Sequence, residues 1–101
     1  MKTTINDLKD KILVTLEGEL DTAAAAEVEK ELQPLFNSDG RDIDIDCTGL
    51  EYIASSGLRI LLSILKGAKA AGSKVTLCHV NDDIQNVFRL TGFDALFEIT
   101  D

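Results

Sequence analysis

Two adjacent serines, Ser55 and Ser56, are the residues of this chain best placed to do chemistry. They precede an apolar pattern that predicts one face of an α-helix, formed by Leu58, Leu61, Leu62 and Leu65. Ser55 therefore falls at the predicted N-cap, where its oxygen would accept a hydrogen bond from a first-turn amide. The same amides and the positive end of the helix dipole would favour a phosphate on that oxygen. Spacing alone leaves two interpretations, a plain helix cap or a hydroxyl that can be modified.

A strand is predicted immediately before the serines. Ile43 and Ile45 alternate with Asp44 and Asp46, which is typical of a half-buried strand over residues 42–47. The helix is predicted over 55–71 and ends at Gly72.

A similar unit is predicted earlier in the chain. Residues 3–7 and 11–17 are expected to form a hairpin of two strands, the second ended by Gly18. Asp21 is expected to cap a helix over 22–36. The residues of this helix expected to face the core are Ala25, Val28, Leu32 and Leu35. Because Pro34 has no N–H to donate, this helix should kink or fray in its last turn.

The remaining elements follow from turn and capping residues. The prediction is a turn over 37–40, a strand over 74–78, a helix capped by Asn81 or Asp82 and ended by Gly92, and a short helix, a final strand or both over 93–99.

Alternation of strands and helices predicts an α/β domain with parallel crossovers. The strands are only half apolar, so the helices should pack mainly on one face of a small mixed sheet and leave the other face solvated. The junctions at 17–22 and 46–56 should leave the carboxyl ends of neighbouring strands. From the residues alone, a helix cap explains Asp21.

Composition limits the classes of function. The 101 residues suit a single domain spanning 1–101, and ten basic against eighteen acidic residues give a net charge of −8. No clustered positive surface is visible, so direct binding to nucleic acid is not expected. No long apolar run or signal peptide is present, which predicts a cytoplasmic protein without membrane insertion. Cys47 and Cys78 are expected to be reduced, buried thiols.

The side chains that could suggest an enzyme do not form a known catalytic arrangement. Asp44 and Asp46 share a strand face that is expected to be solvated, and His79 has no evident partners for a triad with Ser55. Neither of the two glycine-rich phosphate-binding motifs, GxxxxGK(S/T) and GxGxxG, occurs in the sequence. We therefore expect no catalytic residues, no metal site and no cofactor, although a small enzyme or nucleotide binder is the remaining alternative of that class.

The loop around the serines resembles a known family signature. Ala54-Ser55-Ser56-Gly57-Leu58, preceded by Leu50-Glu-Tyr-Ile53, is similar to the signature of anti-sigma factor antagonists, the single-domain bacterial members of the STAS family (sulfate transporter and anti-sigma antagonist). Gly18-Glu-Leu-Asp21 and Phe88-Arg-Leu-Thr-Gly92 resemble that family's first strand-to-helix junction and its late helix. The resemblance covers practically the whole chain and implies a STAS domain.

The resemblance also implies a function. Unphosphorylated protein would bind an anti-sigma factor and release a sigma factor, and phosphorylation of Ser55 by that anti-sigma factor, a serine kinase, would switch it off. Ser56 is the second hydroxyl, and the implied partner-binding residues are Asp21, Ala54, Ser55, Ser56 and Gly57. The resemblance also suggests that the loop ending in Asp21 lies beside the Ser55 loop on a shared partner-binding surface. The free protein would be a monomer. The alternative is a STAS subunit that stabilises or regulates a transport ATPase without phosphorylation.

The chain departs from the family pattern at one position. Phosphorylated members commonly carry Asp-Ser-Ser/Thr-Gly, and Ala54 stands here at the Asp position. If the carboxylate helps to present the acceptor loop, Ala54→Asp should speed phosphorylation. Its effect on stability is expected to be small, about 0.3–1 kcal/mol for a charge beside a helix N-terminus.

Overall fold

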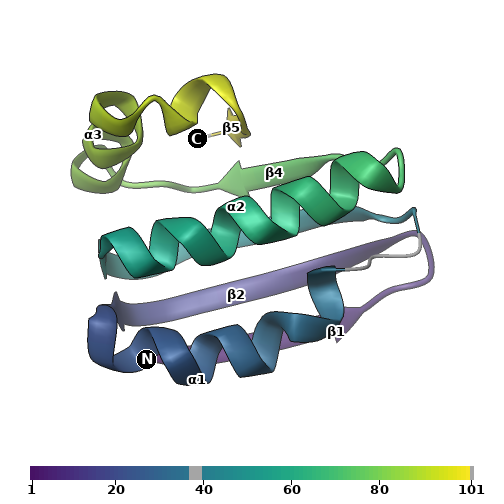
Figure 1. The fold of residues 1–101 in the computed structure, drawn as a ribbon, viewed down its shortest axis with the longest axis horizontal. Helices are drawn as coiled ribbons and strands as arrows, with labels where there is room; N and C mark the ends of the chain where they lie inside the picture. Colours follow the sequence, from purple (N-terminus) through teal and green to yellow (C-terminus); the bar gives the residue numbers. More distant parts are fainter. Residues whose placement is uncertain (37–39, 101) are drawn as a thin grey trace.

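The structure, a computed structural model, describes residues 1–36 and 40–100. Within these residues five strands and three α-helices alternate along the chain (Figure 1). The bounds are β1 Lys2–Asp7, β2 Lys11–Leu20, α1 Thr22–Leu32, β3 Asp42–Ile53, α2 Ser55–Ala70, β4 Val75–Cys78, α3 Asp82–Thr91 and β5 Glu98–Thr100, with short 3₁₀ helices η1 Gln33–Phe36 and η2 Phe93–Ala95. The predicted turn at 37–40 lies mostly outside the described residues.

The strands form one mixed sheet in the order β1-β2-β3-β4-β5. The hairpin partner β1 runs antiparallel to β2, and each later neighbour is parallel. Parallel neighbours require crossovers, and α1, α2 and α3 are those crossovers. The predicted α/β class and mixed sheet are confirmed.

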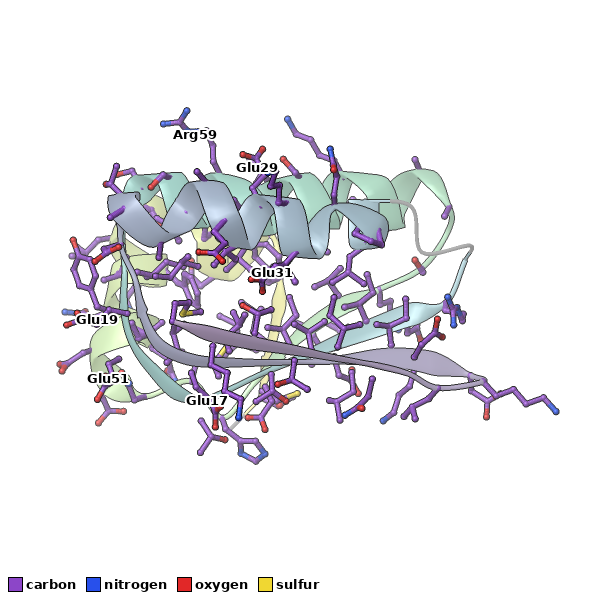
Figure 2. All side chains as sticks on the ribbon, turned by 90° about the horizontal axis from the view of Figure 1, so that it is seen from below. Glu17, Glu19, Glu29, Glu31, Glu51 and Arg59 are labelled. Carbon is purple, nitrogen blue, oxygen red and sulfur yellow. The ribbon has the colours of Figure 1, made fainter. Side chains whose placement is uncertain are left out.

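Helices α1 and α2 run side by side over one face of the sheet (Figures 1 and 2). The alternation within the strands is the cause: Val14 and Ile45 are buried beneath the helices, whereas Thr15 and Asp46 on the other face are only half-buried. Helix α3 adds Ile84 and Phe88 to the same core. The expected arrangement, with helices mainly on one face and a solvated face opposite, is confirmed.

The first helix is shorter than the predicted range 22–36. Its α-helical part ends at Leu32, and the chain continues as the 3₁₀ helix η1, in which Pro34 is the second residue. Proline cannot donate the amide hydrogen that would continue the α-helical ladder. Leu32 and Leu35 are nevertheless both buried, so the apolar face predicted for this segment is retained through the change of helix type.

Strands β2 and β3 extend beyond the predicted bounds. The pairing between them shifts register around Glu17 and Gly18, so that β2 continues to Leu20 and β3 to Ile53. Gly18 adopts a φ of 103°, which glycine tolerates and which lets the strand pass through this bulge instead of ending there. The prediction that Gly18 ends the strand was wrong because a bulge breaks the alternation of period two from which strands are predicted.

The structure of the last third of the chain decides between two pairs of alternatives, the cap of α3 and the conformation of residues 93–99. Asn81, not Asp82, is the N-cap of α3, since its side chain accepts from the Ile84 amide at 2.9 Å. Gly92 ends this helix with a φ of 79°, as expected. Residues 93–99 contain both a short helix and the start of a strand.

The two cysteines are free thiols on opposite faces of the sheet. Cys47 is buried on the helix-covered side, and this burial raises the pKa of its thiol to about 12. Cys78 pairs in register with Asp46 and is half-buried on the open face. The expectation of buried thiols is thus met by Cys47 but only partly by Cys78.

Candidate functional site at the starts of α1 and α2

The loops that follow β2 and β3 are joined by a backbone hydrogen bond. The Ala54 amide donates to the Leu20 carbonyl at 2.9 Å, one residue beyond the last pairing of Leu20 with Ile53. The starts of α1 and α2 therefore lie side by side at the carboxyl edge of the parallel strands. This is the adjacency predicted for Asp21 and Ser55, and it depends on the extension of both strands past the bulge.

The N-cap of α2 lies one residue earlier than the predicted Ser55. Ala54 is the N-cap, with extended φ and ψ of −92° and 171°, and its carbonyl accepts from the Leu58 amide at 3.0 Å. Ser55 is the first helical residue, so its predicted role as N-cap is wrong. The backbone sets the position of the N-cap, because the Ala54 amide still bonds to β2 whereas Ser55 is already part of the helix. No side chain caps α2.

The two serines differ in accessibility. Ser55 is exposed, whereas Ser56 is half-buried and its Oγ is buried without a hydrogen-bond partner among the described residues. A hydroxyl must be reached by a transferring enzyme before it can accept a phosphoryl group. Of the two hydroxyls, that of Ser55 is therefore the more accessible.

Asp21 caps α1, as predicted. Its Oδ1 accepts from the Ala24 amide at 2.8 Å, and the side chain is partly buried. The cap fixes the carboxylate next to the first turn of α1, beside the start of α2. A partner that reaches Ser55 would therefore meet this carboxylate as well.

Gly57 lies below the surface and allows α2 to approach the strands closely. A Cβ at this position would stand 2.7 Å from Leu20 Cγ and 2.9 Å from Ile53 Cγ1. Real Cβ atoms do not come so close, so a larger residue would push the start of α2 outward. Because Gly57 is buried, it would support the proposed surface by positioning Ser55, not by contact with a partner.

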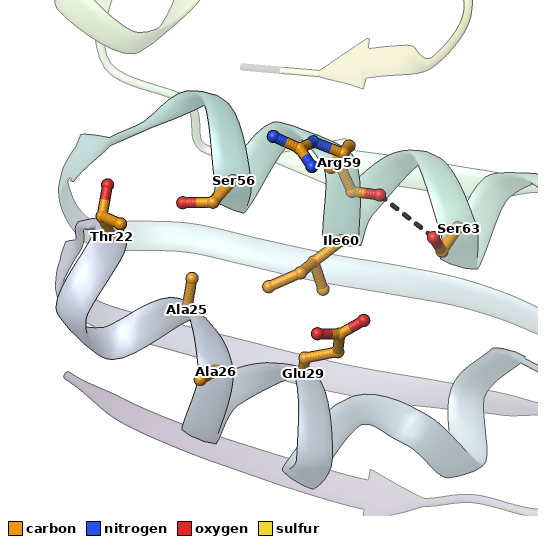
Figure 3. A pocket seen from close by; sticks show the side chains of 8 residues that line it. All are labelled: Thr22, Ala25, Ala26, Glu29, Ser56, Arg59, Ile60 and Ser63. Carbon is orange, nitrogen blue, oxygen red and sulfur yellow. Dashed lines mark hydrogen bonds between the residues drawn. The ribbon is translucent and has the colours of Figure 1, made fainter.

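A pocket of about 310 Å³ lies between α1 and α2 next to the serines (Figure 3). Its lining residues come from the two helices: Thr22, Ala25, Ala26, Glu29, Ser56, Arg59, Ile60 and Ser63. Small side chains on both helices open this space, and three hydroxyls and a guanidinium border it. Arg59 and Thr22 were not predicted as site residues. The signal available for Arg59 was its spacing of four residues from Ser55, which places both on one helix face.

Carboxylates gather at this edge of the sheet. Segments 19–22, 51–59 and 79–83 contain five of them: Glu19, Asp21, Glu51, Asp82 and Asp83. Figure 2 shows Glu19 and Glu51 at the end of the molecule where α2 starts. Within these segments Arg59 is the sole Lys or Arg. Tyr52, with 51% of its surface exposed, stands among the carboxylates and pairs in register with Glu19.

The carboxylates on the open face of the sheet have structural partners. Asp46 accepts from the hydroxyl of Thr48 at 2.6 Å and from its amide at 3.0 Å, and these bonds lower the pKa of the Asp46 carboxyl below its usual 3.8. Asp44 pairs with Lys11 at 3.0 Å. A carboxyl held in its ionised form is unsuited to act as a general acid at neutral pH. The described part of the chain also contains no cluster of His, Cys, Asp and Glu able to hold a metal ion.

The family model described as "Mlab, STAS domain" matches residues 4–99. This chain belongs to the STAS domain family. The match includes at least part of every strand and both helix starts of the site, which agrees with the signature residues around Ser55.

Curated relatives of this STAS domain carry names of one kind. A Bordetella bronchiseptica protein, BtrV, described as a candidate anti-sigma factor antagonist, is 28% identical over 99 residues, covering 98% of this chain and 85% of that protein. The anti-sigma-B factor antagonist of Staphylococcus aureus is 28% identical over 88 residues, covering 87% of this chain and 82% of that protein.

Solved structures share the fold. A candidate anti-sigma factor antagonist from Thermotoga maritima superposes with a TM-score of 0.86 at 23% identity, covering 98% of this chain and 86% of that one. The anti-sigma factor antagonist SpoIIAA matches in its unphosphorylated form with a TM-score of 0.75 at 16% identity, covering 99% and 88%. Bacillus SpoIIAA in its phosphorylated form matches with a TM-score of 0.73 at 16% identity, covering 99% and 92%. No helix in the described residues is long and apolar enough to cross a membrane.

Proposed function

We propose that this STAS domain is an anti-sigma factor antagonist switched off by phosphorylation of Ser55. The observation that carries the proposal is the exposed Ser55 hydroxyl at the first residue of α2, held beside the Asp21 loop by the hydrogen bond from Ala54 to Leu20. The names of the relatives support it, as do the solved structures of SpoIIAA in its unphosphorylated and phosphorylated forms.

The unphosphorylated protein binds an anti-sigma factor and thereby frees a sigma factor. Asp21, Ala54, Ser55 and Ser56 form the docking surface with Gly57 beneath them. The exposed ring of Tyr52 extends it, because a large aromatic side chain at a surface is typical of the residues that dominate binding energy.

Phosphorylation ends this binding. The Ser55 oxygen attacks the γ-phosphorus of ATP, the bond from that phosphorus to the bridging oxygen of ADP breaks, and the serine proton passes to a base of the kinase. The product carries roughly −1.5 to −2 of charge at pH 7. Burial of such a charge in the interface without a matched cation is unfavourable, so the complex dissociates. The kinase, which is the anti-sigma factor itself, provides ATP and Mg²⁺, and this chain needs no cofactor or catalytic residue of its own.

The proposal is tested by incubation with the cognate anti-sigma kinase and ATP, followed by intact mass. Addition of one phosphate is expected for the wild type and Ser56→Ala, and no addition for Ser55→Ala. A phosphate retained on Ser55→Ala and lost from Ser56→Ala would assign the switch to the other hydroxyl. Because Ser56 Oγ is buried, Ser56→Ala should be slower at most.

A separate measurement tests the oligomeric state of the protein. We expect the free protein to be a cytoplasmic monomer, and size exclusion with light scattering before and after phosphorylation should give the monomer mass in both cases. A dimer in the unphosphorylated state would mean that the docking surface pairs with a second copy of the chain.

Ala54 favours one alternative, a STAS subunit that binds a transport ATPase without phosphorylation. In that case Ser55→Ala and Ser55→Asp should bind the ATPase as the wild type does. Stable co-purification with such an ATPase, and no phosphate transfer from any kinase encoded nearby, would select it.

A further inference from the structure

Any phosphate on Ser55 would be placed among negative charges. The carboxylates of Glu19, Asp21 and Glu51 lie at the same edge of the sheet as the start of α2, and no ion pair in the described part of the chain neutralises them. A dianion on Ser55 would add to the negative charge at this edge, so a cation within reach would stabilise it. Among the segments that meet at this edge, Arg59 is the one strong cation.

Arg59 has the position to be that cation. Four residues separate it from Ser55, so both side chains belong to one face of α2, with about one helical turn between them. Long side chains on a helix lean toward its N-terminus. Figure 3 shows the guanidinium turned toward Ser56, at the N-terminal end of the helix.

Arg59 is also uncommitted. The side chain is exposed, and the ion pairs found in the described residues do not include it. Glu29 borders the same pocket from α1, but no ion pair within 4.0 Å joins the two. A planar guanidinium with five donors suits the oxygens of a phosphate monoester.

The start of α2 adds donors to the same place. Ala54 supplies no side-chain cap, and the first turn holds no acidic residue. The N–H groups of the first turn have no acceptor within the helix. The Ser56 hydroxyl, buried and without a partner among the described residues, borders the pocket alongside Arg59.

We propose that Arg59 is a positioning residue that receives the phosphate of Ser55 in an ion pair within the same helix. This inference rests on the proposed phosphorylation of Ser55 and specifies how its product is held. The single positive charge of Arg59 offsets part of the roughly −1.5 to −2 of the phosphate, so a net negative charge remains at the docking surface.

The test uses protein with phosphoserine installed at position 55 during translation, so that no kinase is needed. A ³¹P NMR titration measures the second pKa of the phosphate, which is about 6 in an unpaired phosphoserine. The matched control is Lys66→Gln, which removes one exposed positive charge from the same helix 11 residues from Ser55, roughly 16 Å along the axis.

An ion pair lowers that pKa, since it favours the dianion. We expect Arg59→Gln to raise it by about 0.2–0.4, the size of an i,i+4 pair on a helix surface, and Lys66→Gln to change it by much less. Arg59→Lys should restore most of the difference, and high salt should reduce it. Arg59→Gln indistinguishable from wild type, or equal effects of the two substitutions, would overturn the proposal.

The outcomes also separate this inference from the function beneath it. If the cognate kinase leaves Ser55 unmodified while the titration shows the Arg59 effect, the proposed switch fails and the pairing chemistry stands. If the kinase modifies Ser55 and the titration shows no effect, the switch stands and the assigned role of Arg59 is wrong.

Discussion

Ala54 occupies the one position at the start of α2 where a side chain could cap the helix. Its methyl group cannot accept a hydrogen bond, so α2 begins without the stabilisation that Asp21 and Asn81 give to α1 and α3. The family's usual Asp at this position would be an N-cap as well as part of the acceptor loop. Ala54 in place of Asp is therefore expected to lower the stability of the fold. The sequence alone does not indicate this, because its apolar periodicity predicts Ser55 as the cap.

Ala54→Asp is accordingly expected to raise the free energy of unfolding by about 1 kcal/mol, within the 0.5–2 kcal/mol typical of an N-cap. Ala54→Asn provides the matched control, since it caps without adding a charge. Urea denaturation of both variants measures the gain. A gain for Ala54→Asp alone would assign the effect to the helix dipole, and no gain for either would mean that the cap position is wrong. Faster phosphorylation of the Ala54→Asp variant than of the Ala54→Asn variant would show a separate role for the carboxylate.

At the scale of the elements, prediction from sequence succeeded where one periodicity persisted. The apolar face shared by α1 and η1 was predicted through Leu35, and the alternation of Ile43 and Ile45 correctly placed one face of β3 in the core. It failed at the bulge beside Gly18, where buried residues of β3 recur at intervals of three, as Cys47, Leu50 and Ile53. A pattern of that kind matches neither the period of a strand nor that of a helix.

The site shows the same division. Neighbouring parallel strands fix the adjacency of Asp21 and Ser55, which was predicted from the family resemblance together with the expected topology. The exact start of α2 depends on a hydrogen bond between Ala54 and Leu20, which lie far apart in the sequence. Arg59 was not predicted as a site residue. An exposed arginine on a helix is common, and the charges that surround it are known only from the fold.

One side chain, that of Asn81, joins the start of α3 to the sheet by hydrogen bonds. Asn81 Oδ1 accepts from the Ile84 amide at 2.9 Å, while Asn81 Nδ2 donates to the Leu50 carbonyl at 3.0 Å. Asn81→Ala should therefore lower the free energy of unfolding by about 1–2 kcal/mol. Asn81→Asp keeps the cap but brings a carboxylate against the Leu50 carbonyl. Equal stability of the wild type and Asn81→Asp in denaturant would show that only the cap matters.

At the scale of the whole molecule, the two faces of the sheet give its thiols different reactivity. The buried Cys47 thiol, with its pKa raised to about 12, has almost no thiolate at pH 8, and the thiolate is the nucleophile. Cys78 is half-buried on the open face. We expect a disulfide reagent at pH 8 to label one thiol per folded chain promptly and the second only on unfolding. Cys78→Ser should remove the prompt phase and Cys47→Ser the slow one; the reverse assignment would contradict the placement of the faces.

Charge is distributed unequally between the two ends of the sheet. The ion pairs Lys11–Asp44, Arg41–Asp7 and Lys74–Glu98 all lie where the parallel strands begin. At the other end, no ion pair in the described residues involves Glu19, Asp21 or Glu51, and Arg59 is the sole Lys or Arg of the segments that meet there. An acidic edge of this kind steers a partner with a basic surface toward the docking site.

Association with the anti-sigma factor should therefore slow as ionic strength rises. Combined Glu19→Gln and Glu51→Gln should lower the association rate constant several-fold, a fraction of the roughly 10–10³ that a whole steering field can supply. The matched control is Asp10→Asn, an exposed carboxylate at the opposite end of the sheet. Stopped-flow or surface-based kinetics over a range of salt concentrations measure both. Because steering acts at distance and is screened within about 10 Å at 0.1 M salt, the variants should converge at high salt. A difference that persists there would instead place Glu19 or Glu51 in direct contact with the partner, and an equal effect of Asp10→Asn would mean that net charge alone sets the rate.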